Sequence, residues 1–318
     1  MSYTLSEYPK MIPLCIEEGF CNMACPKCPV HGDDPRHNDI TKGKMDFNKA
    51  LKMFDELRGQ NLTMTPSGVT EPLLQKDFFH YVKALNERDI KITLNSNGLL
   101  INKEMAERLV NEYSIASIFI SIDAMTKETL MKTRASDKLD KINQAVKFLL
   151  EARKSPEDIR IGVSFTVEDA NRDERDSFID YWIKEVDVIR VNELYQYGDE
   201  TTVFQKDRKP CPVLYDTLYI GIDGNARLCC LDTFDETSVG NVFETSVKEV
   251  WHSKELHQIR QYHENGEFEK VPFCRSCQDW ARYIFHTEYE ENGIFVRKSD
   301  LITYYNRIDR MSNWKRCD

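Results

Sequence analysis

Three cysteines near the start of the chain are spaced so that they can hold one metal centre. Cys21, Cys25 and Cys28 lie in the run Cys-Asn-Met-Ala-Cys-Pro-Lys-Cys, which contains no fourth cysteine. A structural zinc site or an electron-transfer cluster closes its shell with four protein ligands. Three thiolates leave one position open, and a substrate-binding iron–sulfur cluster requires such a position. An incomplete zinc site is the alternative interpretation of the same residues.

A second group of cysteines lies late in the chain. Cys274-Arg-Ser-Cys277 by itself is typical of a zinc knuckle. Ten cysteines in a chain without a secretion signal indicate metal ligation more than disulfides, because the cytosol keeps thiols reduced. Cys15 and Cys317 stand apart and are interpreted as structural or incidental. The second group consists of Cys211, Cys229, Cys230, Cys274 and Cys277.

Composition narrows the class of protein. The 318 residues are 41% hydrophobic, which is ample for a packed core. The net charge of −10 argues against nucleic acid as a partner, although Lys206, Arg208 and Lys209 form a local basic patch that can meet an anionic substrate. The N-terminus lacks an apolar signal region, and no segment is apolar enough for a membrane span. We therefore expect a cytoplasmic protein with no membrane partner.

Strand-like and helix-like segments alternate along the first 195 residues and must position these cysteines. This alternation is the βα pattern of a parallel sheet or barrel. The change in composition near residue 200 predicts a domain boundary. Asp223-Gly224 predicts a β-hairpin with arms 217–222 and 226–231, and helices are expected at 246–263 and 299–310. The expected strands are 11–17, 61–66, 90–95, 116–122, 159–167 and 186–194, and the expected helices between them are 46–58, 76–87, 103–112, 139–153 and 172–185.

One parity of the expected strands is polar and the other is apolar. If helices cover the outer face of a six-stranded array, the polar parity lines the concave interior, which then forms a substrate cavity. Some of these residues can equally be polar strand ends. The polar parity contains Thr63, Thr65, Ser67, Thr93, Asn95, Asn97, Ser121, Asp123, Gly162, Ser164, Thr166, Arg190 and Asn192.

These motifs together resemble the radical S-adenosylmethionine (radical SAM) superfamily. The Cys-x3-Cys-x2-Cys run, the turn Ser67-Gly68-Val69-Thr70-Glu71-Pro72 and the segment Ser121-Ile122-Asp123 with Arg134 beyond it carry the resemblance. It implies a partial (β/α)6 barrel, a [4Fe–4S] cluster on Cys21, Cys25 and Cys28, and S-adenosylmethionine as a cofactor. Thr70 replaces a motif glycine, and Lys27 replaces a common aromatic residue. The cofactor-binding residues that it implies are Gly68, Thr70, Glu71, Asn97, Ser121, Asp123 and Arg134.

The second cysteine group resembles the SPASM/twitch extension of that superfamily. Its markers are Asp223-Gly224-x4-Cys229, Gly240-Asn241-Val242, Val250-Trp251, Arg260 and Pro272-x-Cys274-x2-Cys277. The resemblance implies a second [4Fe–4S] cluster on Cys211, Cys229, Cys274 and Cys277, in a small α+β domain. The spacing is most similar to that of twitch-type aminocyclitol or sugar dehydrogenases such as the 2-deoxy-scyllo-inosamine dehydrogenases. The implied domains are a barrel at 1–200, the auxiliary-cluster domain at 201–285 and a C-terminal extension at 286–318.

The resemblance implies an oxidoreductase in which a 5′-deoxyadenosyl radical removes a substrate hydrogen atom. Dehydrogenation of a sugar or aminocyclitol alcohol is the leading hypothesis, with a flavodoxin- or ferredoxin-type reductant. Strand parity nominates Arg190 and Asn192 as groups near the hydroxyl, and places Glu193 on the opposite parity. Cys230 is interpreted as a small buried hydrophobe or as the hydrogen-atom donor of an epimerase.

Two other hypotheses stay open. Relatives with SPASM/twitch domains also modify ribosomal peptides, and about ten residues before the first strand leave no room there for a leader-peptide-binding domain, so a peptide substrate is the less favoured alternative. A non-catalytic zinc or iron–sulfur scaffold that binds a partner protein is the third.

Overall fold

Six parallel strands follow one another through the first part of the chain, as the alternating pattern predicts. The structure is a computed structural model, and it describes residues 3–34, 36, 40, 42–66, 68, 70–195 and 208–311. The six strands are β1 (Met11–Leu14), β4 (Thr63–Pro66), β5 (Lys91–Ser96), β6 (Ser117–Ser121), β7 (Arg160–Val167) and β8 (Val188–Glu193). A two-stranded ribbon of β2 (Glu17–Glu18) and β3 (Gly43–Lys44) flanks the cysteine loop.

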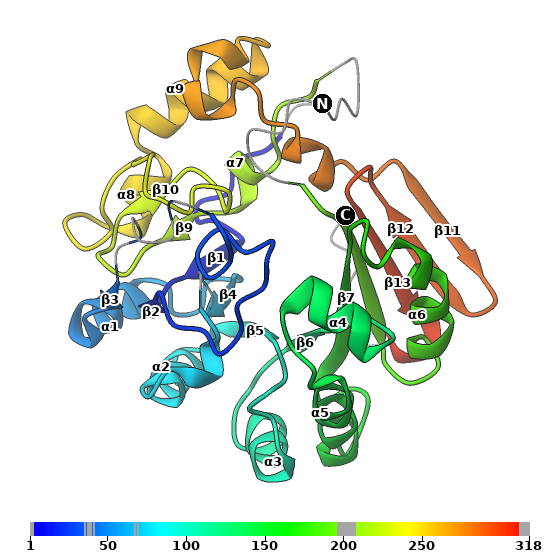
Figure 1. Ribbon diagram of the computed structural model, residues 1–318. Helices are drawn as coiled ribbons and strands as arrows, with labels where there is room; N and C mark the ends of the chain where they lie inside the picture. The colour runs from blue at the N-terminus through cyan, green and yellow to red at the C-terminus, as the bar shows by residue number, and fades with distance from the viewer. Residues whose placement is uncertain are drawn as a thin grey trace.

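Helices follow the strands and cover the outside of the sheet (Figure 1). Asp46 caps α1 by accepting a hydrogen bond from the Lys49 amide, and Asn102 caps α3 in the same way. The helix α4 is absent from the sequence expectations; Thr126 caps its N-terminus. The helices are α1 (Phe47–Glu56), α2 (Phe78–Asn86), α3 (Lys103–Asn111), α4 (Lys127–Arg134), α5 (Leu139–Ala152) and α6 (Arg175–Trp182), with short 3-10 turns η1 (Pro72–Leu74) and η2 (Arg172–Glu174).

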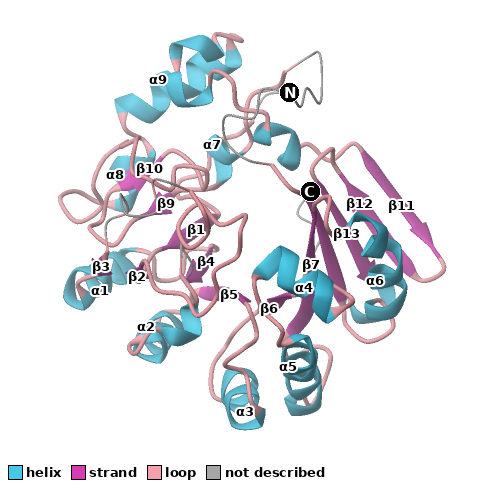
Figure 2. Cartoon of the chain, in the orientation of Figure 1, coloured by secondary structure: helices cyan, strands magenta, loops and turns pink. Residues whose placement is uncertain are grey.

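The strands form a curved sheet (Figure 2), and side chains of the predicted polar parity contact one another on it. The Oγ1 atoms of Thr65 and Thr93 lie 2.7 Å apart on neighbouring strands. Arg190 Nη2 donates to Asn95 Oδ1 at 2.9 Å across the sheet. These contacts join side chains of the predicted polar parity, so the interior is polar, as expected. Ser67 lies outside the described residues.

The second part of the chain adds to the same sheet. The hairpin strands β9 (Tyr219–Ile220) and β10 (Ala226–Arg227) are shorter than the expected arms, and β9 pairs in parallel with β1. The expected helix 246–263 is two helices, α8 (Val247–Trp251) and α9 (Lys254–Glu264). The break arises because Ser253 caps α9 by accepting from the Leu256 amide. The remaining elements here are α7 (Val213–Asp216), η3 (Phe268–Lys270), η4 (Pro272–Cys274) and η5 (Asp279–Tyr283).

The C-terminal residues form strands where the sequence analysis expected a helix. The expectation of a helix at 299–310 is wrong: β13 (Ile302–Arg307) pairs antiparallel with β8, and the turn η6 (Ile308–Arg310) follows it. Ile302 to Tyr305 are β-branched or aromatic, and such residues favour strands when a partner strand is present. β11 (Thr287–Glu291) and β12 (Ile294–Lys298) complete this antiparallel addition.

One sheet therefore runs through the whole described chain. Its eleven strands follow the order β10-β9-β1-β4-β5-β6-β7-β8-β13-β12-β11. The apolar parity of the barrel strands, including Leu94, Ile118 and Val163, is fully buried. The predicted fold, a partial βα barrel followed by a small α+β region, is confirmed in class. No helix within the described residues is long and apolar enough to cross a bilayer.

Candidate functional site

The three N-terminal cysteines lie on a tight loop after β1 that folds around a glycine. The Cys28 amide donates to the Cys25 carbonyl at 2.9 Å, and the Gly32 amide donates to the Cys28 carbonyl at 3.0 Å. A Cβ atom at Gly32 would lie 2.6 Å from the Cys25 and Pro26 carbonyl oxygens and 2.7 Å from that of Cys28. Only glycine leaves room for these carbonyls. The loop backbone is thus closed by a residue that the motif does not include.

Lys27 ties this loop to the carboxyl ends of two barrel strands. Its Nζ lies 2.7 Å from Asp123 Oδ2, just past β6, and 2.7 Å from Glu168 Oε1, just past β7. From the sequence alone, Lys27 is notable only because it replaces an aromatic residue that is common at this position. The structure shows that it is the ionic link between the cysteine loop and the sheet.

Asp123 is the centre of this network. Its side chain is 1% exposed, it pairs with Arg134 Nε at 3.0 Å, and it accepts from the Thr166 amide at 2.7 Å. Burial raises the pKa of Asp123, but the charges of Lys27 and Arg134 outweigh burial and lower it to about 2. Its φ of 61° is in the left-handed region, which is uncommon for a residue other than glycine. The carboxylate is therefore fixed as an anion.

The turn after β4 holds the residue next to Cys21. The Glu71 amide donates to the Phe20 carbonyl at 2.8 Å, and the Thr70 hydroxyl donates to the same oxygen. The Glu71 carboxylate is buried, and it accepts from Ser96 Oγ and from the Asn97 amide, each at 2.8 Å. Burial raises its pKa. This turn thus connects the cysteine loop with the end of β5.

The other predicted cofactor residues are distributed around the same loop. Asn97 Nδ2 donates to Asn22 Oδ1 at 2.7 Å, which is a direct contact with the loop. Ser121 accepts from Ser164 Oγ at 3.3 Å on the concave side of the sheet. Gly68 lies elsewhere: a Cβ atom there would be 2.5 Å from Cys15 Sγ, so it packs against β1.

The second cysteine set converges from three separate segments of the chain. Burial raises the pKa of Cys211 well above its usual value, and charges on Cys277 and Cys274 raise it further. Burial raises the pKa of Cys229 well above its usual value, and charges on Cys230, Cys211 and Cys277 raise it further. Cys211 therefore interacts with Cys274 and Cys277, and Cys229 interacts with Cys211 and Cys277. The Cys277 amide also donates to the Cys274 carbonyl at 3.2 Å, which folds the Cys-x2-Cys segment into a turn.

The donor chemistry of both sets fits iron–sulfur clusters. Within the described ranges, no three His, Cys, Asp or Glu side chains converge on a point where one metal ion would bind. A [4Fe–4S] cluster does not need this, because each thiolate binds a different iron. A buried guanidinium nitrogen without a hydrogen-bond partner, Nε of Arg208, lies beside the second set. An unsatisfied donor of this kind suits a sulfur-rich anionic group.

A cavity of about 420 Å³ lies between the first cysteine loop and the second cysteine region. Lys27 and Cys28 line it on one side, and Tyr195 and Cys230 line it on the other. This volume falls in the range of small-molecule pockets. The cavity thus joins Cys28 of the first set with Cys230, the chain neighbour of Cys229.

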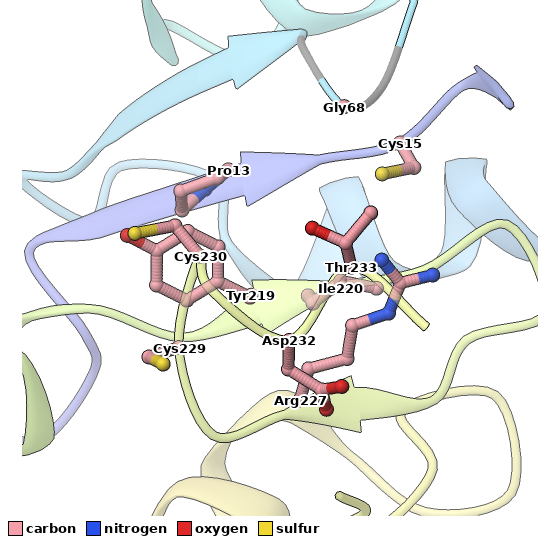
Figure 3. A pocket seen from close by; sticks show the side chains of 10 residues that line it. All are labelled: Pro13, Cys15, Gly68, Tyr219, Ile220, Arg227, Cys229, Cys230, Asp232 and Thr233. Atoms are coloured by element: carbon pink, nitrogen blue, oxygen red, sulfur yellow. The ribbon is translucent and has the colours of Figure 1, made fainter. Parts of the chain in front are cut away.

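A smaller cavity of about 160 Å³ lies between β1 and the β9–β10 hairpin (Figure 3). Cys230 lines both cavities. Its Sγ and the Tyr283 hydroxyl share a hydrogen bond of 3.8 Å, and the Tyr219 ring lies beside it (Figure 3). Burial of the sulfur, which removes its hydration, raises the pKa of the thiol, although the residue as a whole is exposed toward the cavities. The interpretation of Cys230 as a buried hydrophobe is therefore wrong.

Cys15 lines the smaller cavity and is buried, and Cys317 lies outside the described residues.

Arg190 and Asn192 lie on the concave side of β8, but neither lines these two cavities. The Arg190 guanidinium carbon lies 4.7 Å from the centre of the Phe119 ring, in addition to its bond to Asn95. Asn192 Oδ1 accepts from Arg282 at 3.4 Å. Both side chains are engaged with the protein, so their proposed role near a substrate hydroxyl stays a prediction.

Sequence reasoning missed several residues of the site. Lys27 lies within the cysteine run and Gly32 lies shortly after it. Their closeness to the cysteines is the sequence signal that could have indicated them. Arg208 was noted only as part of a basic patch, whose Lys206 lies outside the described residues. Tyr219 and Tyr283 carry no local signal, because the fold alone brings them to Cys230.

Two protein-family models match the chain. The model of the radical SAM superfamily matches residues 19–182, which is more than half of the chain. The model of the SPASM iron–sulfur cluster-binding domain matches residues 211–278. Among curated proteins, the chain is 23% identical over 191 residues to a probable GTP 3′,8-cyclase of Sulfurisphaera tokodaii. That match covers 59% of this chain and 58% of the length of that protein.

Solved structures share the fold at low sequence identity. BtrN in complex with AdoMet and 2-DOIA has a TM-score of 0.57 at 17% identity, and the match covers 86% of this chain and 94% of BtrN. Streptococcus suis SuiB bound to precursor peptide SuiA has a TM-score of 0.63 at 14% identity, covering 86% and 72%. The enzyme anSMEcpe with bound AdoMet has a TM-score of 0.61 at 15% identity, covering 84% and 88%. The chain thus belongs to the radical SAM superfamily: it is a radical SAM enzyme with a SPASM domain, and its cofactors are [4Fe–4S] clusters and S-adenosylmethionine.

Proposed function

We propose that this enzyme dehydrogenates an alcohol carbon of a sugar or aminocyclitol. One observation carries the proposal: a single cavity of about 420 Å³ is lined by Cys28 of the first set and by Cys230, the neighbour of Cys229 in the second. A substrate in this cavity lies between a site for hydrogen abstraction and a site for electron removal. The similarity in fold to BtrN, which binds AdoMet and 2-DOIA, supports a small-molecule substrate.

The proposed ligand sets are those that the family resemblance implies. Cys21, Cys25 and Cys28 would hold the cluster with the open position, and Cys211, Cys229, Cys274 and Cys277 would hold the second. When bound, these groups supply a 5′-deoxyadenosyl radical and an electron acceptor. The residues proposed to contact S-adenosylmethionine are Gly68, Thr70, Glu71, Asn97, Ser121, Asp123 and Arg134.

The chain's own residues fix the reacting geometry. Lys27 and Asp123 hold the cysteine loop against the strand ends, so the first site keeps one position relative to the cavity. The secondary alcohol of the substrate loses one hydrogen atom from carbon, then the hydroxyl proton and one electron, and becomes a ketone. We propose that Arg190 and Asn192 orient polar groups that extend into the barrel interior. The external electron donor is proposed to be of the flavodoxin or ferredoxin type.

Epimerisation is the second candidate, and the position of Cys230 favours it. A thiol that opens onto the cavity can return a hydrogen atom to the opposite face of the substrate radical. The product then has the mass of the substrate. A peptide substrate is the remaining alternative, since the neighbour SuiB binds a precursor peptide.

The first experiment tests the two-cluster assignment. The protein is reconstituted anaerobically, and iron and sulfide are counted in the wild type, in a Cys21/Cys25/Cys28 triple alanine variant and in a Cys15→Ala control. We expect about eight irons per chain in the wild type and the control, and about four in the triple variant. Dithionite and S-adenosylmethionine should give 5′-deoxyadenosine only when the first set is intact. Zinc, or cleavage by the triple variant, would refute the assignment.

The second experiment separates the two reactions. Amino-bearing cyclitols and hexoses are incubated with the reconstituted enzyme in deuterium oxide. A product two mass units lighter, retained in Cys230→Ala, supports dehydrogenation. One carbon-bound deuterium, lost in Cys230→Ala, supports epimerisation instead.

A further inference from the structure

Arg208 lies over the second cysteine set and is held there by backbone carbonyls. Its Nη2 donates to the Cys274 carbonyl at 2.7 Å, and its Nη1 donates to the Arg275 carbonyl at 3.1 Å. The guanidinium carbon lies 4.1 Å from the centre of the Phe268 ring. These contacts place one cation beside the Cys-x2-Cys turn in a fixed orientation.

The third nitrogen of this guanidinium is left over. Nε of Arg208 is buried, and it has no hydrogen-bond partner within the described residues. A buried donor without an acceptor costs free energy, and the cost is larger for a charged group. The arginine charge also interacts with the thiols of Cys277, Cys274 and Cys211. The side chain therefore combines an unused donor with a positive charge at the place where anionic sulfur is expected.

We propose that Arg208 is a positioning residue for the auxiliary cluster: its Nε–H donates to a cluster sulfur, and its charge raises the reduction potential of that cluster. The inference rests on the proposed assignment of Cys211, Cys229, Cys274 and Cys277 as ligands. Hydrogen bonds to the sulfurs and local charge are known determinants of cluster potential. A nearby cation stabilises an added electron, and the effect is large where burial lowers the dielectric. Arg208 thereby favours acceptance of the electron that leaves the substrate.

The test uses protein that holds only the second cluster and needs no substrate. In the Cys21/Cys25/Cys28 triple alanine background, Arg208→Gln, Arg208→Lys and Arg275→Gln are reconstituted, and the midpoint potential is measured by EPR-monitored redox titration. Arg275→Gln is the matched control, because it removes the same charge from an exposed side chain one residue from Cys274. We expect Arg208→Gln to lower the potential. Arg208→Lys should give an intermediate value, since lysine keeps the charge but not the planar fork, and Arg275→Gln should match the parent.

The outcomes separate the two proposals. If the parent binds no iron, the ligand assignment fails. If it binds about four irons and Arg208→Gln leaves the potential unchanged, the inference about Arg208 is overturned. If Arg208→Gln loses its iron, the test rests on Arg208→Lys. A midpoint potential of Arg208→Lys equal to that of the parent would then overturn the inference.

Discussion

At the scale of single residues, the Asp123 carboxylate organises two cations that come from different parts of the chain. Lys27 belongs to the cysteine loop, and Arg134 is the last residue of α4. The Lys27 and Arg134 side chains are only 13% and 11% exposed, so the loss of Asp123 would leave their charges less well compensated in a mostly buried place. Lys27 retains Glu168, but Arg134 does not contact that residue.

Replacing Asp123 by Asn should therefore destabilise the fold strongly. Removing one partner of a buried ion pair costs about 3–5 kcal/mol, because the remaining charges stay buried. The free energy of unfolding is measured by urea denaturation at pH 7. Asp140→Asn is the control, since it removes a carboxylate from a surface pair with Lys127 and should cost less than about 1 kcal/mol. Equal losses in both variants would contradict this account.

The same carboxylate predicts a dependence of stability on pH. The pKa of Asp123 is depressed from 3.8 to about 2 in the folded chain. Its contribution to stability is present above pH 3.8 and is lost as the pH falls through about 2. The loss amounts to roughly 2–3 kcal/mol. Urea titrations from pH 5 to pH 2 should show this loss in the wild type. If Asp123→Asn showed the same loss, other carboxylates would be responsible.

Gly32→Ala should disrupt the first cluster site. The new methyl group would collide with three backbone carbonyl oxygens, so the loop that carries Cys25 and Cys28 must move. We expect iron in the reconstituted variant to fall from about eight to about four per chain. Gly59→Ala is the control: its φ of 74° makes alanine strained, but no atom lies within 4 Å of the added group. Full iron content in Gly32→Ala would show that the loop tolerates the displacement.

Local sequence indicates the candidate ligands, and it does not indicate their surroundings. Cys21, Cys25 and Cys28 are recognisable because their spacing lies within one loop. The partners of Lys27 and Arg208 are not, because Asp123 is 96 residues from Lys27 and Cys274 is 66 residues from Arg208. Residue types alone do not show which distant side chains a fold brings together.

At the scale of elements, the alternation of strands and helices predicted the barrel, and a strand at the end of the chain was mistaken for a helix. At least one helix lies between each two successive barrel strands, so a local periodic pattern carries the information. β13 is a strand because β8 offers an edge to it, with Tyr304 opposite Arg190. That pairing joins segments more than 100 residues apart in sequence, and a short periodic pattern does not report it.

Asp187 links three elements, and its removal should be costly. It pairs with Arg153 at the end of α5, accepts from the Ile161 amide of β7 at 2.8 Å, and lies 3.4 Å from Arg310 after β13. The side chain is 1% exposed. Asp187→Ala should lower the free energy of unfolding by roughly 3–5 kcal/mol in urea denaturation. Asp169→Ala, at a fully exposed carboxylate, is the control and should change it by less than about 1 kcal/mol.

At the scale of the whole molecule, the two cysteine regions are parts of one packed body. β9 extends the barrel sheet beyond β1, and Arg227 of β10 pairs with the buried Glu18 at 3.1 Å. Trp251 of α8 donates to the Ser6 carbonyl at 3.0 Å. We therefore expect cooperative unfolding across the predicted domain boundary near residue 200.

That expectation is tested with two probes in the cluster-free chain. Variants that retain only Trp182, in α6, or only Trp251 report on the two regions by fluorescence. Their urea transitions should coincide within error, as two-state unfolding requires. Separate midpoints would show that the regions unfold independently and that the shared sheet does not couple them.

The open sheet also affects how copies of the protein associate in solution. A sheet that does not close ends in edge strands, and here one edge is β11, whose residues are all exposed and include Glu288, Glu290 and Glu291. Like charges on an edge discourage pairing between copies, and the net charge of −10 acts in the same direction. Stocks of the enzyme are thus expected to stay monodisperse at neutral pH.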